Sequence, residues 1–181
     1  MKIKKILFSF LVVMFVAIFT VSSNAYSLQA YGYPTVYIPI KSAVSSEYTN
    51  AVKNAVAAWN NAIPITTGKK NKVKTLFYFD NKASNVIYSQ ERSESWVGAY
   101  SYYTKKGKTY KFNIYLNDRL LKNKSENYKQ SVAVHELGHA LSLNDNPPET
   151  QSIMRYDRNR NIMIVPQPDD IAGVKKQYGL D

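Results

Sequence analysis

The 181-residue chain contains no cysteine. A protein without cysteine has no disulfide bonds, so its fold depends on core packing, on a bound metal ion, or on both. Metal binding through thiolates is excluded for the same reason. Histidine is nearly as scarce, because the sequence holds only two, His135 and His139. A metal site in this chain therefore has at most two imidazole ligands, and any further ligand is an oxygen.

Acidic residues are also few, since 13 of them stand against 24 lysines and arginines, for a formal charge of +11. Lysines cluster at 69–74 and at 105–108, beside turn-like residues. Solvated loops explain such clusters, and electrostatic attachment to an anionic cell surface is the alternative. No nucleic-acid-reading module is recognisable, so we expect no nucleic-acid partner. Internal repeats are absent as well.

The N-terminus has the order of a secretory signal peptide. Lysines at 2, 4 and 5 precede an uncharged run at 6–21, and small residues lead up to Ala25. We expect cleavage after Ala25, so that residues 1–25 are a signal peptide and residues 26–181 form one secreted, monomeric catalytic domain of charge +8. The alternative is an uncleaved anchor, although the run is shorter than the roughly 20 residues of a spanning helix.

The mature chain alternates strand-like and helical patterns. A first strand is expected at 34–40, confined by Pro34 and Pro39 to an edge or a bulge. Helical spacing then runs from Ser45 to Pro64, with Trp59 as a core anchor. Further strands are expected at 75–79, 85–88, 98–103 and 110–117, and the last two form an antiparallel pair joined by the turn at 105–108. Two more helices are expected, from about 123–125 to Leu143 and from Asp169 to Gly179.

The expected helix that ends near Leu143 carries the sequence VAVHELGHALSLND, residues 132–145. His135 and His139 are four residues apart, so both lie on one helix face and can bind the same ion. Glu136 is rotated out of the ligand set but stays close to a water bound there. This spacing indicates a zinc hydrolase acting on peptide bonds, with Glu136 as the catalytic base.

A catalytic zinc takes three protein ligands and leaves one position for water. With cysteine absent and both histidines used, the third ligand must be a downstream oxygen donor. If the helix stops one turn after His139 and the chain reverses, Asp145 can return beneath the metal. Glu149 is the next candidate, and an Asx-turn before Pro147 is the alternative role of Asp145.

These residues resemble the long metzincin signature H-E-x-x-H-x-x-G-x-x-H, which is followed by a Met-turn. His135, Glu136 and His139 match it, Asp145 stands in the place of the third histidine, and residues 152–156 (SIMRY) look like the Met-turn. Beyond the motif, residues 34–179 are similar to matrixin catalytic domains in the pattern of their helix ends and strand ends. The chain is therefore identified as a small secreted bacterial type of metzincin with HExxHxxSxxD.

Ser142 departs from the signature, because it occupies the glycine position at which the chain turns sharply. A serine with positive φ costs on the order of 1 kcal/mol. Either Ser142 adopts that conformation or the reversal is displaced toward Asn144. Matrixins also carry a propeptide cysteine, and its absence here excludes that latency device.

The resemblance implies an α+β metzincin fold, in which a twisted mixed sheet of about five strands has an antiparallel edge strand and the zinc helix packs beneath it. It implies Glu136 as general base, Tyr156 as an oxyanion stabiliser or a pocket wall, and Met154 as apolar flooring beneath the zinc. An extended polypeptide substrate would pair with the edge strand, with Ala99, Tyr100 and Ser101 facing its backbone. Matrixin-like domains often carry calcium, but no ligand-spaced acidic loop supports Ca²⁺ here.

Two other functions fit the same sequence. A zinc amidase acting on cell-wall peptide would use the same metal chemistry. A secreted basic binding protein or adhesin would need no catalysis, but a purely structural zinc has no use for Glu136 and is normally closed by four protein ligands. The secreted zinc endopeptidase is therefore the favoured prediction.

Overall fold

Residues 26–29, 33–67 and 72–180 are described by the structure, a computed structural model. The expected signal peptide (1–25) and much of the first lysine cluster (69–71) lie outside the described residues. Within the described residues, no helix has the length and apolar character needed to cross a membrane.

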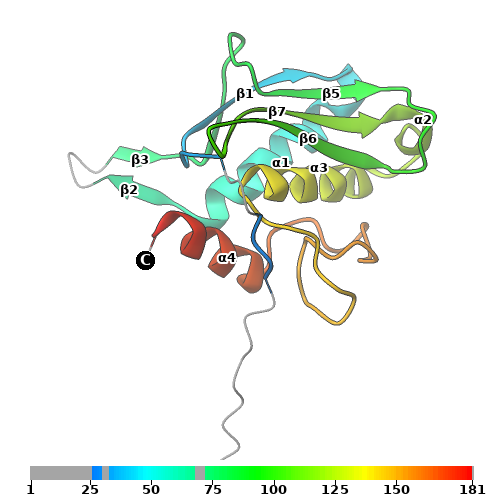
Figure 1. Cartoon of the computed structure of the whole chain (residues 1–181). Coiled ribbons are helices and arrows are strands. Elements are labelled where there is room, and N and C mark those ends of the chain that lie inside the picture. Colours follow the sequence, from blue (N-terminus) through cyan, green and yellow to red (C-terminus); the bar gives the residue numbers. More distant parts are fainter. Residues whose placement is uncertain (1–25, 30–32, 68–71, 181) are drawn as a thin grey trace, which may run out of the picture.

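A five-stranded mixed sheet forms the upper layer of the molecule (Figure 1). Its strand order is β4-β1-β5-β7-β6, in which all neighbours are parallel except the antiparallel pair β6 and β7. The expected mixed sheet with an antiparallel edge strand is confirmed. The strands are β1 (Ile38–Ala43), β4 (Phe77–Phe79), β5 (Val86–Gln90), β6 (Gly98–Lys105) and β7 (Lys108–Asn117). A separate hairpin of β2 (Ile65–Thr67) and β3 (Lys72–Lys74) was not anticipated.

The expected edge position of the first strand is wrong, because β1 lies between β4 and β5 and begins later, at Ile38. Its first half pairs with β4 and its second half, from Lys41, pairs with β5. Pro39 lies in the first half, before pairing with β5 starts, so no ladder bond on that side requires its missing N–H. The Pro39 carbonyl is satisfied there by the side-chain amide of Asn85 at 3.0 Å.

Helices α1 and α3 pack against each other on one face of the sheet (Figure 1). Trp59 of α1 is completely buried between them, and its indole N–H donates to the Val134 carbonyl at 2.8 Å. The expected core role of Trp59 is therefore confirmed. The helices are η1 (Ser46–Tyr48), α1 (Thr49–Ala62), α2 (Asp118–Leu121), α3 (Glu126–Ala140) and α4 (Pro168–Tyr178), of which α2 was not anticipated.

Along β7, Phe112, Ile114 and Leu116 are all fully buried against the helices, but Asn113 and Asn117 are buried as well, so burial does not strictly alternate. The hairpin between β6 and β7 turns at Lys106 and Gly107, both of which have positive φ. β6 pairs with β7 alone, so its other backbone edge has no strand partner within the described part of the chain. The structure thus supplies the open sheet edge that the sequence predicted.

Helix α3 begins as expected, because the Ser125 hydroxyl accepts a hydrogen bond from the Tyr128 N–H at 3.1 Å. It ends at Ala140, three residues before the expected Leu143. Helix α4 ends at Tyr178, and Gly179, at which the helix was expected to stop, caps it with a left-handed backbone. The early end of α3 is what allows the following segment to reverse toward the histidines.

Candidate metal centre and active site

The two histidines of α3 present their Nε2 atoms to one point. His135 Nδ1 lies 3.0 Å from the Ile153 carbonyl oxygen, and His139 Nδ1 lies 2.8 Å from that of Leu143. When both Nδ1 atoms donate to these carbonyls, both Nε2 atoms keep a free lone pair. Burial lowers the pKa of both imidazoles, that of His135 to about 4. Both rings are therefore neutral at physiological pH, as a metal ligand must be.

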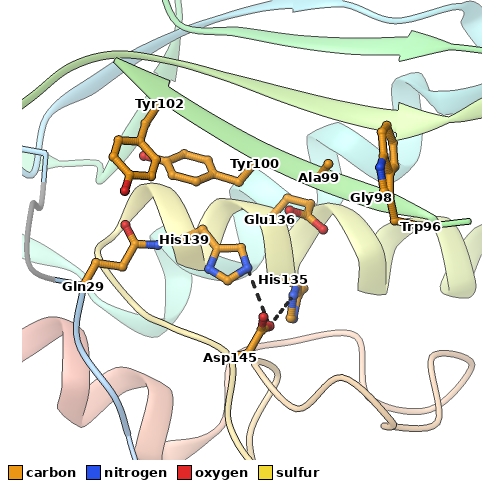
Figure 2. A pocket seen from close by; sticks show the side chains of 10 residues that line it. All are labelled: Gln29, Trp96, Gly98, Ala99, Tyr100, Tyr102, His135, Glu136, His139 and Asp145. Atoms are coloured by element: carbon orange, nitrogen blue, oxygen red, sulfur yellow. Dashed lines mark ion pairs between the residues drawn. The ribbon is translucent and has the colours of Figure 1, made fainter. Parts of the chain in front are cut away.

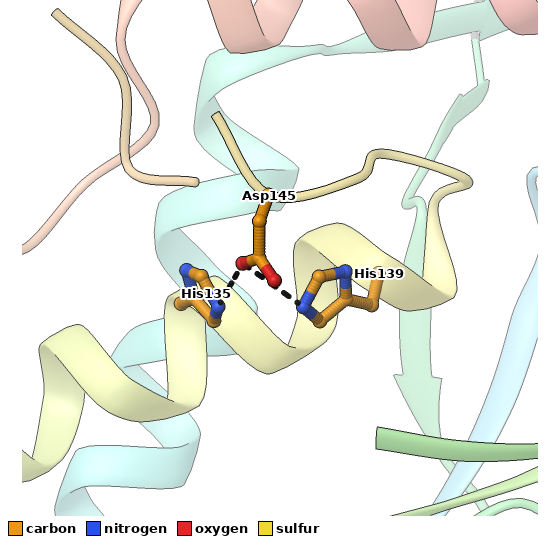
Figure 3. Close-up of side chains that lie close together, drawn as sticks. All are labelled: His135, His139 and Asp145. Carbon is orange, nitrogen blue, oxygen red and sulfur yellow. Dashed lines mark ion pairs between the residues drawn. The ribbon is translucent and has the colours of Figure 1, made fainter. Parts of the chain in front are cut away.

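Asp145 closes the site from the segment that follows α3 (Figure 3). Its Oδ1 lies 3.1 Å from His135 Nε2 and 3.7 Å from His139 Nε2. The close approach of the His135 ring, and then of His139, lowers the pKa of Asp145, so this group is a carboxylate at neutral pH. Two imidazole lone pairs and a carboxylate that converge within 4.8 Å repel one another unless a cation lies between them. We call these three residues the metal triad, and their donor set fits zinc.

Ser142 itself makes the turn between the two halves of the triad. Its φ is +72°, and it is fully buried. The Leu143 N–H donates to the Gly138 carbonyl at 3.0 Å and the Ser142 N–H to that of His139 at 3.0 Å, which is the Schellman pattern usually built on glycine. Of the two alternatives left open by the sequence, the structure therefore selects the strained serine. Its Oγ lies 3.3 Å from the Tyr178 hydroxyl of α4.

A short N-terminal segment, residues 27–29, runs along this turn. The Gln29 N–H donates to the Ser142 carbonyl and the Asn144 N–H to that of Ser27, both at 2.8 Å. The Asn144 side chain also donates to the Leu28 carbonyl at 2.9 Å. The backbone that carries Asp145 is thereby held on both sides, by α3 and by this segment.

Met154 lies fully buried beneath α3. A Cβ placed on Gly138 would lie 2.3 Å from the Met154 sulfur and 3.3 Å from the Trp59 ring, so only glycine at 138 allows this approach. Met154 is buried against α3 and does not belong to the metal triad, and its role as apolar flooring beneath the zinc stays a prediction.

Asp170 ties the Met154 segment to the start of α4. It accepts hydrogen bonds from the Ser152 hydroxyl, and from the Ile153 and Gln167 N–H groups at 2.8 Å each. The sequence predicted only that the last helix starts at Asp169, and the adjacent charges of Asp169 and Asp170 suit such an N-terminus. The fully buried Asp170 has this second role, which sequence reasoning missed because adjacent aspartates at a helix start look alike.

Glu136 lies beside the metal triad beneath β6 (Figure 2). A Cβ on Gly98 would lie 2.5 Å from Glu136 Oε1, so β6 passes directly over the carboxyl group. Burial raises the pKa of Glu136 to about 8 in the protein alone. A carboxyl group with a raised pKa next to a metal site suits proton transfer at neutral pH.

One cavity at the site, the edge cavity, has a volume of about 330 Å³ and follows β6 past the metal triad (Figure 2). Ala99 and Tyr100 line it as predicted, whereas Ser101 does not. Tyr102 and Gln29, which the sequence did not single out, line it as well.

A second cavity, which we call the arginine cavity, has a volume of about 350 Å³. Tyr156 lines it with a side chain that is 56% exposed, near Glu136 and Asp145. The structure thus brings Tyr156 to the site but leaves it free of close contact with the triad. Arg158 and Arg160 line the same cavity and were not anticipated, because two arginines after a Met-turn carry no signal of their own in a basic chain.

The fold and the site together define a metzincin-type zinc protein, and comparison with known families agrees. Residues 33–179 match the family model described as matrixin. The chain belongs to the matrixin family, a family of zinc metalloproteases. No curated protein sequence is significantly similar to the chain.

Two solved structures resemble the chain at low sequence identity. One is described as the GM1-bound form of the ECX AB5 holotoxin, with 13% identity and a TM-score of 0.49, covering 85% of this chain and 84% of that chain. The other is high choriolytic enzyme 1, a hatching-enzyme zinc protease from the medaka fish Oryzias latipes, with 16% identity and a TM-score of 0.43, covering 85% and 96%.

Proposed function

We propose that the protein is a secreted zinc endopeptidase that hydrolyses extended polypeptides. The observation that carries the proposal is the convergence of two imidazole nitrogens and one carboxylate within 4.8 Å, with Glu136 beside them and an open strand edge above. A structural zinc site is normally closed by four protein ligands, whereas this group offers three.

His135, His139 and Asp145 would hold the metal in this proposal. Zinc bound there supplies Lewis acidity, which acidifies a water and polarises a carbonyl. Glu136 takes the proton of the attacking water and delivers it to the leaving amine. Tyr156 lines the arginine cavity, where it would act as an oxyanion stabiliser or as a wall of that cavity.

The substrate backbone would add to the sheet along β6. The outer edge of β6 pairs with no strand among the residues that the structure describes, and residues 98–100 pass over Glu136. An extended peptide paired there would be drawn across the metal triad with its scissile bond next to Glu136. This placement explains why a protease would keep an uncovered strand edge.

The test is the variant Glu136→Gln, which removes the base and keeps the shape of the side chain. We expect the purified protein to retain its zinc and to lose hydrolysis of casein by about 100-fold or more. The matched control is Glu149→Gln, because Glu149 is exposed and lies outside the metal triad. Wild-type turnover in a zinc-replete Glu136→Gln protein contradicts the proposal.

Two further measurements separate the rival functions. A zinc amidase would release peptide from purified cell wall in a chelator-sensitive reaction and leave casein intact, whereas a binding protein would cleave neither.

Secretion is tested by sequencing the N-terminus of the exported protein, which we expect to begin at Tyr26. Release from anionic cell surfaces by salt would support electrostatic attachment, and sedimentation would test the expected monomer.

A further inference from the structure

The edge cavity and the arginine cavity extend in opposite directions from the same centre. Both are lined by Glu136 and by His135 of the metal triad. The edge cavity continues toward His139, whereas the arginine cavity continues toward Val132, one turn earlier on α3. A chain crossing the centre would therefore place a side chain in or over the arginine cavity next to its scissile bond.

Arg158 contributes a buried positive charge to that cavity. It is only 4% exposed, and its guanidinium donates to the hydroxyl and carbonyl of Ser131 at 3.1 and 3.0 Å and to the Arg155 carbonyl at 2.7 Å. Its Nη1 also lies 3.1 Å from His135 Nδ1, which does not accept from it while Nδ1 donates to the Ile153 carbonyl. These partners are neutral, and no ion pair joins Arg158 to a carboxylate among the described residues. The guanidinium is thus held in place by neutral groups and not by a direct ion pair.

Arg160 adds a second charge with spare donors. Its Nη2 donates to the Tyr156 carbonyl at 2.8 Å, and its guanidinium lies over the Tyr128 ring, 5.6 Å from the centroid. Its Nε is buried and has no acceptor within the described part of the chain. A buried donor without an acceptor costs free energy, and a bound acceptor would remove that cost.

Within the arginine cavity, the acidic groups are Glu136 and Asp145, and the proposed chemistry already uses both. A divalent metal held by the triad offsets their two charges, so Arg158 and Arg160 have no other acidic group in the cavity lining to balance them; Asp170, whose charge also acts on Arg158, lies outside that lining. Guanidinium groups bind carboxylates through paired, charge-assisted hydrogen bonds. The missing partner of this cavity is therefore an anionic group on the substrate.

We propose that the arginine cavity is a specificity pocket that selects a carboxylate next to the scissile bond, supplied by an aspartate or glutamate side chain of the substrate. This inference rests on the proposed peptidase function. Trp96 and Val132 form apolar walls of the same cavity and can pack against the methylene groups of the acidic side chain. A pocket that pairs a buried cation with its ligand rejects uncharged isosteres, because they leave the cation unpaired.

Cleavage of a C-terminally amidated peptide library tests the proposal first. We expect aspartate and glutamate to be enriched at one position flanking the cleaved bond. Matched peptides with Glu or Gln at that position should then differ in kcat/KM by about tenfold or more. The free-acid library is run in parallel. If the preference appears only in free-acid peptides that are cut close to their C-terminus, the carboxylate that binds the arginines is the C-terminal one. The pocket chemistry is then the same, but the carboxylate comes from the end of the substrate chain.

Variants then assign the selectivity to the arginines. Arg160→Gln and Arg158→Lys should each reduce the Glu-over-Gln preference toward unity. Lys108→Gln, which removes one charge from the distant hairpin turn, should leave it unchanged and so control for net charge. A preference for apolar residues at both flanking positions overturns the proposal, and so does a Glu preference that survives both arginine variants.

Equilibrium binding separates this inference from the proposed function. The Glu136→Gln protein should bind the Glu peptide about tenfold more tightly than the Gln peptide, and Arg160→Gln in that background should abolish the difference. A chain that cleaves no peptide but shows this binding difference contradicts the peptidase proposal and supports the pocket. Equal binding of the two peptides contradicts the pocket, whether or not the chain is a peptidase.

Discussion

At the scale of single residues, Asp145 is the most exposed member of the metal triad, with 60% of its side chain accessible. Removing a residue that only hydrogen-bonds to a metal ligand weakens metal binding by roughly 10- to 100-fold. Because Asp145→Ala removes one of the three ligands themselves, we expect a larger loss of zinc affinity. Zinc content after dialysis against a competing chelator measures the effect.

Glu149→Ala is the control for this prediction, since it removes an exposed carboxylate that lies close to Asp145 in the chain. Its zinc content should equal that of the wild type. Full zinc occupancy in Asp145→Ala would instead assign the third ligand elsewhere, with Glu149 as the first residue to examine.

Ser142 is the second residue whose conformation decides the site. Its φ of +72° is readily adopted by glycine and disfavoured for any residue with a Cβ. Both Ser142→Gly and Ser142→Ala remove the hydroxyl near Tyr178, so the two variants differ mainly in backbone strain. We expect the glycine variant to be more stable than the alanine variant by about 1 kcal/mol. Urea denaturation measures the difference, and equal stabilities would show that position 142 carries no strain.

At the scale of elements, the N-terminus of α4 holds the Met154 segment through Asp170. Three donors point at its carboxylate, and Asn at this position would turn an amide N–H₂ toward some of them. We expect Asp170→Asn to lower the free energy of unfolding by about 1–3 kcal/mol. Thermal or urea unfolding measures it.

Asp169→Asn is the matched variant, because Asp169 shares the first turn of α4 but is only partly buried. Both variants remove one negative charge from the helix N-terminus, where such a charge is worth about 0.3–1 kcal/mol. An equal loss of stability in both variants would mean that Asp170 acts only through its charge at the helix N-terminus. Its role in positioning the Met154 segment would then be wrong.

At the scale of the whole molecule, a bound metal would connect α3 to the segment that begins at Ser142. The core around Trp59 is independent of the metal, since it is formed by α1, α3 and the sheet. We expect chelation to preserve the far-UV circular dichroism spectrum while lowering the melting temperature. Zinc present at about 1,000 times its Kd contributes about 4 kcal/mol, or a shift of roughly 10 °C for a domain of this size.

Scanning calorimetry with chelator, and again after zinc is restored, measures that shift. Recovery on adding zinc is the control for irreversible damage. An unchanged melting temperature would mean that the native chain binds zinc no more tightly than the unfolded chain does. The assignment of the metal triad as a zinc site would then be wrong.

Features that depend on local spacing follow from the sequence alone. The i and i+4 positions of His135 and His139 require only that α3 be helical, and the burial of the alternate apolar residues along β7 requires only a half-buried strand. The hairpin, the cap at Gly179 and the motifs that carry the matrixin resemblance likewise depend on short segments of contiguous residues. For this reason the fold class and the metal-binding helix are predictable from the order of the amino acids.

Features that depend on residues distant in sequence follow only from tertiary packing. Pro39 tolerates an interior strand because β4 and β5 pair with different halves of β1. Ser142 keeps its positive φ where α3, α4 and the N-terminal segment surround it, and Arg158 acquires its cavity because the chain after Met154 returns to α3. Spacing along the chain encodes local geometry, whereas burial and unpaired charge arise only when separate segments pack together.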